Sequence, residues 1–561
     1  MVSNVGRDSE DISTAYWRSY QFVGSLIAIV LVGHSLFLGY VLPVNVLSII
    51  NQDIGPSNNV TLISLVFTLV SGVCLLLVGR ISDVVGRRYF IIGGQAFGLI
   101  GSIVCANAKS INMVIGGTVF VGLSGAVANL YPLLVQELMP NKYRGYGQAA
   151  VTLAMVPTLG FGPLIARSLV TYTALSWRWC YWLNVIVTGL AIILLATCYF
   201  PPNFHQLNTN MTKMQEFKQL DYGGFVLYCA GLILILLGFS WPSSQYTWRD
   251  PHVISTLVVG CACLISFVVY EICMPLKQPL LPMHLFKIRT FVAVVIVGSV
   301  GQMVYFALNI LWPQQITTLY TTNNMKIGAI SCTTGAALAL GEVITGPFFK
   351  AVGHARWQIV ASAVGLTAFC GMMAATNANT QAMAIAGTII AGIFVGWIEM
   401  VCIVTATLVV PPEDIGSASA FFASVRAVSG TIAVSIYVVI FSNELTANLP
   451  KEIVPAVVGA GLPVGSVPLL FEAVSNGTAT ALNAVPGINP GIIAALKIAT
   501  KTAYSSSFKM VYLSSLGFGG FAVAASFFAK NVDQFMTDFV NKTVVNKSRH
   551  VKEKTGDAEL V

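Results

Sequence analysis

Four ionisable side chains lie inside long apolar runs of this sequence. Glu342, Glu399 and Arg426 occupy three runs of the C-terminal half, and His34 occupies the first run. A glutamate or an imidazole can bind and release a proton, and an arginine can balance a carboxylate or meet an anionic ligand. These residues are therefore candidates for proton or substrate coupling. The alternative is a static role, in which an ion pair fixes helix packing and the histidine only packs.

The composition indicates what surrounds these charges. Of the 561 residues, 56% are hydrophobic and only 9% are charged, whereas an ordinary globular chain is about 25% charged. A water-soluble fold with so few charges could not cover its surface, so the expected solvent is lipid. We expect an all-α polytopic membrane protein in which each charge within a span costs roughly 2.5–3.5 kcal/mol.

The net charge of +8 does not indicate a nucleic-acid partner. Six of the 30 basic residues follow residue 529, and most others lie in short loops between apolar runs. This distribution is the positive-inside pattern of membrane proteins. It predicts that both tails are cytoplasmic and that the number of spans is even. The polar first 20 residues do not form a cleavable signal peptide, so we expect the first helix to be retained.

Fourteen apolar runs approach the length of about 20 residues that a spanning helix needs. The expected spans are 23–43, 60–79, 89–107, 112–135, 147–169, 179–200, 222–241, 252–273, 291–313, 327–349, 357–375, 381–408, 417–441 and 509–529.

A short repeat divides these spans into two halves. Glycine, charge and glycine recur at one spacing after the second and the tenth span, at Gly79, Asp83, Gly86 and at Gly346, Lys350, Gly353. Internal repeats are typical of transporter folds. We expect a tail at 1–22, a six-helix bundle at 23–200, a linker with two inserted helices at 201–290, a second six-helix bundle at 291–529 and a tail at 530–561.

The longest connection, 443–508, is expected on the outer side. Its six prolines argue against a further span, so we expect a folded cap of short amphipathic helices. Asn476 and Asn59 begin Asn-X-Thr sequons on the same side, which makes them candidate glycosylation sites.

The sequence contains no cluster of metal ligands, no nucleophile motif and no cofactor loop. It also lacks any Gly-Lys dipeptide, which excludes a P-loop for ATP. We therefore expect no enzyme activity, no cofactor and no metal, and an ion gradient as the energy source.

Polar and aromatic side chains in the first and ninth spans suit a cavity for a bulky, partly apolar substrate. Ordinary helix packing and aromatic belts explain the same residues equally well. They are Asn45, Gln302, Asn309, Gln314, Gln315, Tyr305, Phe306 and Trp312.

The segment 79–88 resembles the loop signature of the major facilitator superfamily, G-x-x-x-D-x-x-G-R-R, at every position. The resemblance implies a cytoplasmic gate formed by Gly79, Asp83, Gly86, Arg87 and Arg88.

The chemistry of this loop suggests how such a gate would close. Asp83 could face the amino-terminal end of the span at 417–441, where helix amides carry partial positive charge and Ser417 could be the N-cap. The two arginines could pair with Glu413 and Asp414. The alternative is that both arginines only set topology.

Other segments resemble fourteen-helix drug:proton antiporters, at 177–179, at 220–224 and at the antiporter-like motif of the fifth span, Gly160, Gly162 and Pro163. Within this group the chain is most similar to the fungal trichothecene efflux pump family, through 162–167, 396–399, 424–430 and the long outer loop.

This resemblance implies proton-coupled efflux of a toxin, drug or secondary metabolite by alternating access. We also expect a monomer, with the plasma membrane as the default location and a vacuolar or vesicular membrane as the alternative. Uptake of siderophore-bound iron or of another small molecule is the alternative function. Many proton antiporters of the superfamily carry an arginine in the fourth span, where this chain has Thr118. The role in proton coupling that this arginine has in those antiporters therefore cannot be carried over to this chain.

Overall fold

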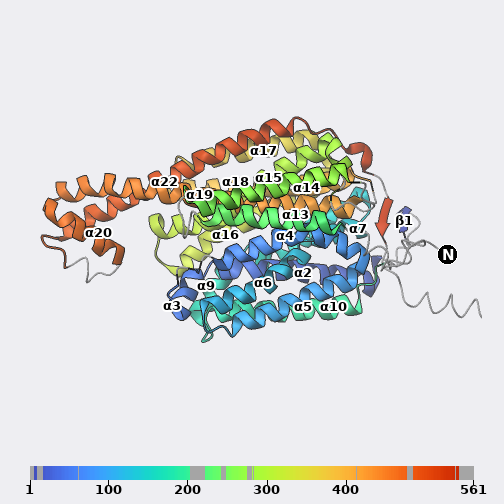
Figure 1. The fold of residues 1–561 in the computed structure, drawn as a ribbon, viewed down its shortest axis with the longest axis horizontal. Coiled ribbons are helices and arrows are strands. Elements are labelled where there is room, and N and C mark those ends of the chain that lie inside the picture. Colours follow the sequence, from blue (N-terminus) through green and yellow to red (C-terminus); the bar gives the residue numbers. More distant parts are fainter. Residues whose placement is uncertain are drawn as a thin grey trace, which may run out of the picture.

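The computed structural model describes residues 5–8, 17–57, 59–60, 62–201, 221–241, 248–274, 281, 283–411, 414–476, 484–536 and 539–542. Long helices run side by side along the longest axis of the molecule (Figure 1). Among the described residues, thirteen helices are long and apolar enough to cross a membrane. The chain is an all-α polytopic membrane protein, as its composition predicts.

The helices form two groups that lie side by side (Figure 1). The N-terminal group contains α2 (Tyr20–Val44), α3 (Leu47–Ile54), α4 (Leu62–Val85), α5 (Arg87–Ala106), α6 (Ile111–Ala128), α7 (Tyr131–Leu138), η2 (Asn141–Tyr143), α8 (Arg144–Leu159), α9 (Gly162–Tyr172) and α10 (Arg178–Thr197). The C-terminal group contains α15 (Arg289–Gln315), η5 (Ile316–Tyr320), α16 (Asn324–Val352), α17 (Ala355–Met373), α18 (Gln381–Leu408), α19 (Ile415–Gly459) and α22 (Pro490–Ser526).

Two seams join the groups. α4 packs along α19, and α8 with α9 pack along α16. Between the groups in sequence come α13 (Tyr222–Ser240), α14 (Pro251–Cys273) and η4 (Met283–Lys287). α13 contacts both α4 and α19, so the inserted helices lie at the α4–α19 seam.

The count of fourteen spans depends on α17. This helix coincides with the expected span at 357–375, but it is not among the thirteen, because Arg356 and Gln358 lower its mean hydropathy. α17 packs along α18 and α22, and it is the helix that would complete the predicted count.

The two ends of the molecule differ. At one end, called the tail end, β1 (Val5–Asp8) pairs antiparallel with β2 (Phe539–Lys542), with Val5 opposite Lys542 (Figure 1). Segments near both termini therefore lie at the same end, which the charge pattern predicts to be cytoplasmic. The opposite end, called the cap end, carries α3 and the segment 443–508.

The prediction of short amphipathic helices in the cap was wrong for most of the segment. α19 runs on to Gly459 and α22 begins at Pro490, so both project beyond the bundle (Figure 1). An apolar run in the sequence marks only part of each helix, and both helices continue beyond the end of that run. η7 (Val464–Ser466) and α20 (Val467–Asn476) complete the cap around a small apolar core that includes Val457, Leu470 and Ile492.

Glycines bring α16 and α18 into close contact within the C-terminal group. A Cβ added to Gly396 would lie 2.1 Å from the Leu338 carbonyl oxygen, and one added to Gly341 would lie 2.3 Å from the Ile393 carbonyl oxygen. Such distances leave no room for a side chain. Gly396 belongs to the same segment of α18 as Glu399, so this packing fixes where that carboxylate lies.

We predict that Gly396→Leu destabilises the protein by about 1–3 kcal/mol, because the added side chain must push α16 away. Thermal unfolding of the purified protein measures the effect. Gly517→Leu is the control, since a Cβ at Gly517 meets nothing within 4 Å. Equal melting temperatures for the two variants would contradict the packing argument.

Candidate functional site

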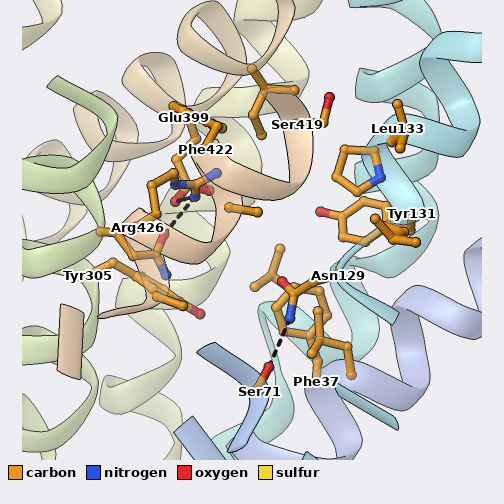
Figure 2. A pocket seen from close by; sticks show the side chains of 18 of the residues that line it. Phe37, Ser71, Asn129, Tyr131, Leu133, Tyr305, Glu399, Ser419, Phe422 and Arg426 are labelled. Carbon is orange, nitrogen blue, oxygen red and sulfur yellow. Dashed lines mark hydrogen bonds and ion pairs between the residues drawn. The ribbon is translucent and has the colours of Figure 1, made fainter. Parts of the chain in front are cut away.

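A cavity lies between the two helix groups, and Figure 2 shows its lining at close range. Its walls come from α2, α4, α7 and α8 on one side and from α15, α16, α18 and α19 on the other. Aromatic rings from both groups contribute to it, namely Phe37, Tyr40, Phe67, Tyr131, Tyr305, Phe306 and Phe422. An aromatic cavity with few polar groups suits a bulky, partly apolar molecule.

Arg426 and Glu399 form an ion pair in the wall of this cavity. One guanidinium nitrogen of Arg426 donates to a carboxylate oxygen of Glu399, and the same nitrogen donates to Gln302 Oε1 at 2.6 Å. The guanidinium carbon lies 5.0 Å from the centre of the Phe422 ring, within the range of a cation–π contact. The pair is thus largely shielded, with 12% and 9% of the two side chains exposed.

Glu342 lines the same cavity and lies beside Glu399. Its side chain accepts a hydrogen bond from Thr152 Oγ1 at 2.5 Å, and both residues are buried. Thr152 belongs to α8, so this hydrogen bond crosses from one helix group to the other. In the described part of the chain no salt bridge reaches Glu342. The cluster therefore holds two carboxylates and one guanidinium, and the guanidinium is paired with Glu399.

His34 does not join this cluster. Its Nδ1 lies 2.7 Å from Thr158 Oγ1 on α8, and the residue is not part of the cavity lining. The structure therefore brings Glu342, Glu399 and Arg426 together and leaves His34 in a packing contact between α2 and α8. Of the residues expected to line a cavity, Gln302, Tyr305 and Phe306 do so, whereas the other five are not in the lining.

The signature loop meets α19 at the tail end. A Cβ on Gly79 would lie 2.5 Å from the Ala420 side chain, so α4 and α19 touch at this glycine. Gly86 adopts φ +102°, a conformation that favours glycine, in the turn between α4 and α5. Arg87 forms a buried ion pair with Glu137 of α7 at 2.9 Å.

The pairing predicted between the loop arginines and Asp414 was wrong, whereas the pairing with Glu413 stays a prediction because Glu413 lies outside the described residues. Arg88 donates to the Ala196 carbonyl at 2.6 Å and lies over the Phe200 ring, while Asp414 pairs with His284 at 2.7 Å. The reason is that α5 packs on α6 and α10 within its own group, which brings Arg88 to the Ala196 carbonyl of α10.

Ser417 is not the N-cap of α19 either, because that position belongs to Asp414 and Ser417 lies within the helix. Glu413 and the side chains of Asp83 and Asn476 lie outside the described residues. Asn59 is half-buried in the turn before α4, at the cap end.

The antiporter-like motif forms a break in the α8/α9–α16 seam. α8 ends at Leu159 and α9 begins at Gly162, with Pro163 in its first turn. A Cβ on Gly160 would lie 3.2 Å from Ala336 of α16, and one on Gly162 would lie 2.9 Å from Val41 of α2. The motif thus allows close packing of span 5 on both neighbours.

Comparison with known proteins places this arrangement in a family. The family model for the fungal trichothecene efflux pump matches residues 3–559. The chain belongs to the fungal trichothecene efflux pump family. Trichothecene efflux pump TRI12 of Fusarium sporotrichioides is 30% identical over 556 residues, covering 98% of this chain and 93% of that protein. MFS-type transporter prx5 of Penicillium rubens is 33% identical over 450 residues, covering 78% and 80%.

Solved structures show the same fold for this family member. The human organic anion transporter MFSD10 superimposes with a TM-score of 0.53 at 11% identity, covering 89% of this chain and 99% of that one. A double tryptophan mutant of XylE also gives 0.53, at 14% identity, with 92% and 98% covered. The chain has the major facilitator fold, and it is a multi-pass membrane transporter.

Three contacts between the groups at the tail end were missed by sequence reasoning. Arg144 of α8 donates to the carbonyl and hydroxyl oxygens of Thr407 on α18, both at 3.3 Å. Lys350 of α16 lies 4.5 Å from the Tyr143 ring. A Cβ on Gly145 would lie 2.6 Å from the Gly346 carbonyl. A basic residue at the start of a span resembles a topology signal, so the sequence does not mark Arg144 as a contact.

The cap end carries contacts of its own. Arg167 of α9 donates to Asn324 Oδ1 at 2.7 Å, again between the groups. Within the N-terminal group, Trp177 Nε1 and Arg178 Nη1 donate to Asp53 Oδ2 at 2.9 and 2.8 Å. The indole of Trp177 and then the guanidinium of Arg178 hold the pKa of Asp53 below its usual value of 3.8. The cavity therefore lies between contacts at both ends.

We predict that Arg87→Glu lowers stability by about 3 kcal/mol or more, because it leaves Glu137 beside a like charge in a buried site. The double variant Arg87→Glu/Glu137→Arg restores part of the loss by re-forming the pair. Membrane yield and thermal unfolding of the purified variants measure both effects. A double variant less stable than the single one would show that the ion pair is not what these residues contribute.

We predict that Asp53→Asn lowers the melting temperature at neutral pH by a small amount, since this carboxylate is half-exposed. Because folding depresses the pKa of Asp53, its contribution is fully present above pH 3.8 and is lost as pH falls through the lower, folded value. Wild type and variant should therefore converge in strongly acidic buffer. A difference that stays constant with pH would contradict this origin.

Proposed function

We propose that this chain exports partly apolar small molecules across a membrane and uses protons as the driving ion. The observation that carries the proposal is the cavity between the helix groups, where aromatic rings surround Glu342, Glu399 and Arg426. Relatives whose printed names describe trichothecene efflux pumps support export as the direction. Uptake of siderophore-bound iron gains no support from the relatives reported above.

The lining suits an apolar molecule that carries a few oxygen atoms. Rings such as Phe37, Tyr305 and Phe306 can cover its apolar faces, while Asn129 and Gln302 offer amide groups that can orient it. Arg426 can meet a substrate oxygen when its pairing with Glu399 loosens. A trichothecene-like secondary metabolite, toxin or drug has this chemistry.

Glu342 is the proposed proton carrier. Arg426 balances Glu399, so the second carboxylate in the cluster has no cation of its own among the described salt bridges. A proton on Glu342 would remove a charge that the site does not otherwise neutralise. The proton would also change the hydrogen bond with Thr152, which joins the two helix groups. Loading and unloading this carboxylate is therefore linked directly to the relative position of the groups.

The energy of one proton is sufficient for useful efflux. Moving one charge through 100 mV provides about 2.3 kcal/mol, and one pH unit adds roughly 1.4 kcal/mol. Together they sustain a substrate gradient of a few hundredfold per proton. The proposal includes a monomer that acts as a transporter and not as an enzyme, in the plasma membrane or, as the alternative, in a vacuolar or vesicular membrane.

We predict that Glu342→Gln reduces proton-driven efflux at least about tenfold, because an amide cannot exchange a proton. The assay is efflux of a panel of sesquiterpenoid toxins and antifungals from expressing cells, with and without a protonophore. Glu472→Gln, an exposed position in the cap, is the matched control. Glu399→Gln provides a second comparison, since it removes the carboxylate that balances the charge of Arg426 in the cavity.

Export that Glu342→Gln abolishes at unchanged membrane expression supports this assignment. Export that survives both Glu342→Gln and the protonophore rules out proton coupling through this residue. A lack of export for every compound tested would contradict the proposed direction.

A further inference from the structure

The inserted helix α13 lies against the seam between the two helix groups. Tyr228, Leu232 and Leu236 follow one another at four-residue spacing and are 6%, 4% and 1% exposed, so they form the buried face of this helix. Val226 is 60% exposed and lies on a different face. α14 packs along α13, and the ring of its Phe267 lies 5.4 Å from the Tyr228 ring.

Tyr228 is part of a chain of hydrogen bonds that joins three helices. Its hydroxyl lies 2.6 Å from Ser424 Oγ on α19, and Ser424 Oγ donates to the Gly72 carbonyl on α4 at 2.8 Å. A serine hydroxyl has one proton, and here that proton points to Gly72. The Tyr228 hydroxyl must therefore be the donor to Ser424. Helix α13 is thus hydrogen-bonded to Ser424, and Ser424 in turn joins the two helix groups through its hydrogen bond to Gly72.

The burial of this chain makes it sensitive to movement of the seam. Ser424 is fully buried and Tyr228 nearly so, and a buried hydroxyl that loses its partner is destabilised. Hydrogen bonds in series also strengthen one another in a site that excludes water. If α4 and α19 separate at this level, Ser424 loses Gly72 and the donor from Tyr228 no longer holds it in place.

We propose that the inserted helix pair α13–α14 is a clamp on the α4–α19 seam, and that the Tyr228 hydroxyl is its hydrogen-bonding contact. The clamp favours the arrangement in which this seam is closed. Tyr228 is therefore a positioning residue for transport, acting through Ser424 and not on the substrate. The inference rests on the proposed alternating-access function, but it does not depend on proton coupling.

The test measures how often the cavity opens at the tail end. Ser419 lines the cavity (Figure 2). It comes five residues before Ser424 and is therefore nearer the start of α19. A Ser419→Cys reporter is placed in the full chain, reconstituted in lipid nanodiscs and treated with a hydrophilic maleimide. Protein with Ser419 intact gives the background from the native cysteines. The labelling rate then reports opening without any need for a known substrate or a proton gradient.

We expect Tyr228→Phe to raise the labelling rate about two- to tenfold, the range for losing one net hydrogen bond. Ser424→Ala should raise the labelling rate as well. The double variant should raise the rate by less than the product of the two single-variant factors, because both changes break the same series of hydrogen bonds. Tyr172→Phe, at a position 74% exposed on α9, is the control and should leave the rate unchanged.

Two results would overturn the proposal. If Ser424→Ala raises labelling and Tyr228→Phe does not, the seam is held without the inserted helices, which are then a passive linker. If the effects of Tyr228→Phe and Ser424→Ala on the labelling rate multiply in the double variant, the two hydroxyls act independently and do not form one series of hydrogen bonds. Neither result bears on export itself, which the efflux assay with Glu342→Gln tests separately.

Discussion

A charge inside a membrane-spanning bundle is expensive to hold, and the centre of this structure is organised by that constraint. Arg426 can neutralise one carboxylate, and it is paired with Glu399 while its guanidinium lies over the Phe422 ring. Glu342 is the second carboxylate; it lies beside Glu399 and accepts a hydrogen bond from a threonine hydroxyl of the other helix group. A neutral hydroxyl supports a carboxylate without cancelling its charge. When both glutamates are ionised, the cluster therefore carries one negative charge that no described salt bridge neutralises.

The contacts that join the two helix groups depend on how closely their backbones approach. Gly79 lets α4 touch Ala420, and Gly145 lies against the Gly346 carbonyl. Hydrogen bonds such as those from Thr152 to Glu342 and from Ser424 to Gly72 form across these seams. The close backbone packing and these polar contacts therefore belong to the same two interfaces. A movement of one group changes both.

The sequence predicts the fold and the charged cluster well because a membrane protein needs long apolar segments, and charges within such segments are rare. Apolar runs reveal the spans, and a glutamate within such a run stands out, which is how Glu342 and Glu399 could be found. The same signal selected His34, whose partner is Thr158 and not the cavity. Partners could not be predicted, since hydropathy does not say which helix a loop faces. For that reason the predicted pairing of the loop arginines with Asp414 was wrong, and neutral Thr152 gave no signal.

The proposed role of Glu342, to hold the proton that is exchanged for substrate, is tested by proton release on substrate binding. Purified protein in weakly buffered detergent solution is mixed with a compound that the chain exports, and a pH-sensitive dye records the protons released. We expect release from the wild-type protein and none from Glu342→Gln, at substrate concentrations that saturate both. Equal release from the two proteins would contradict it and would place the exchanged proton on another group.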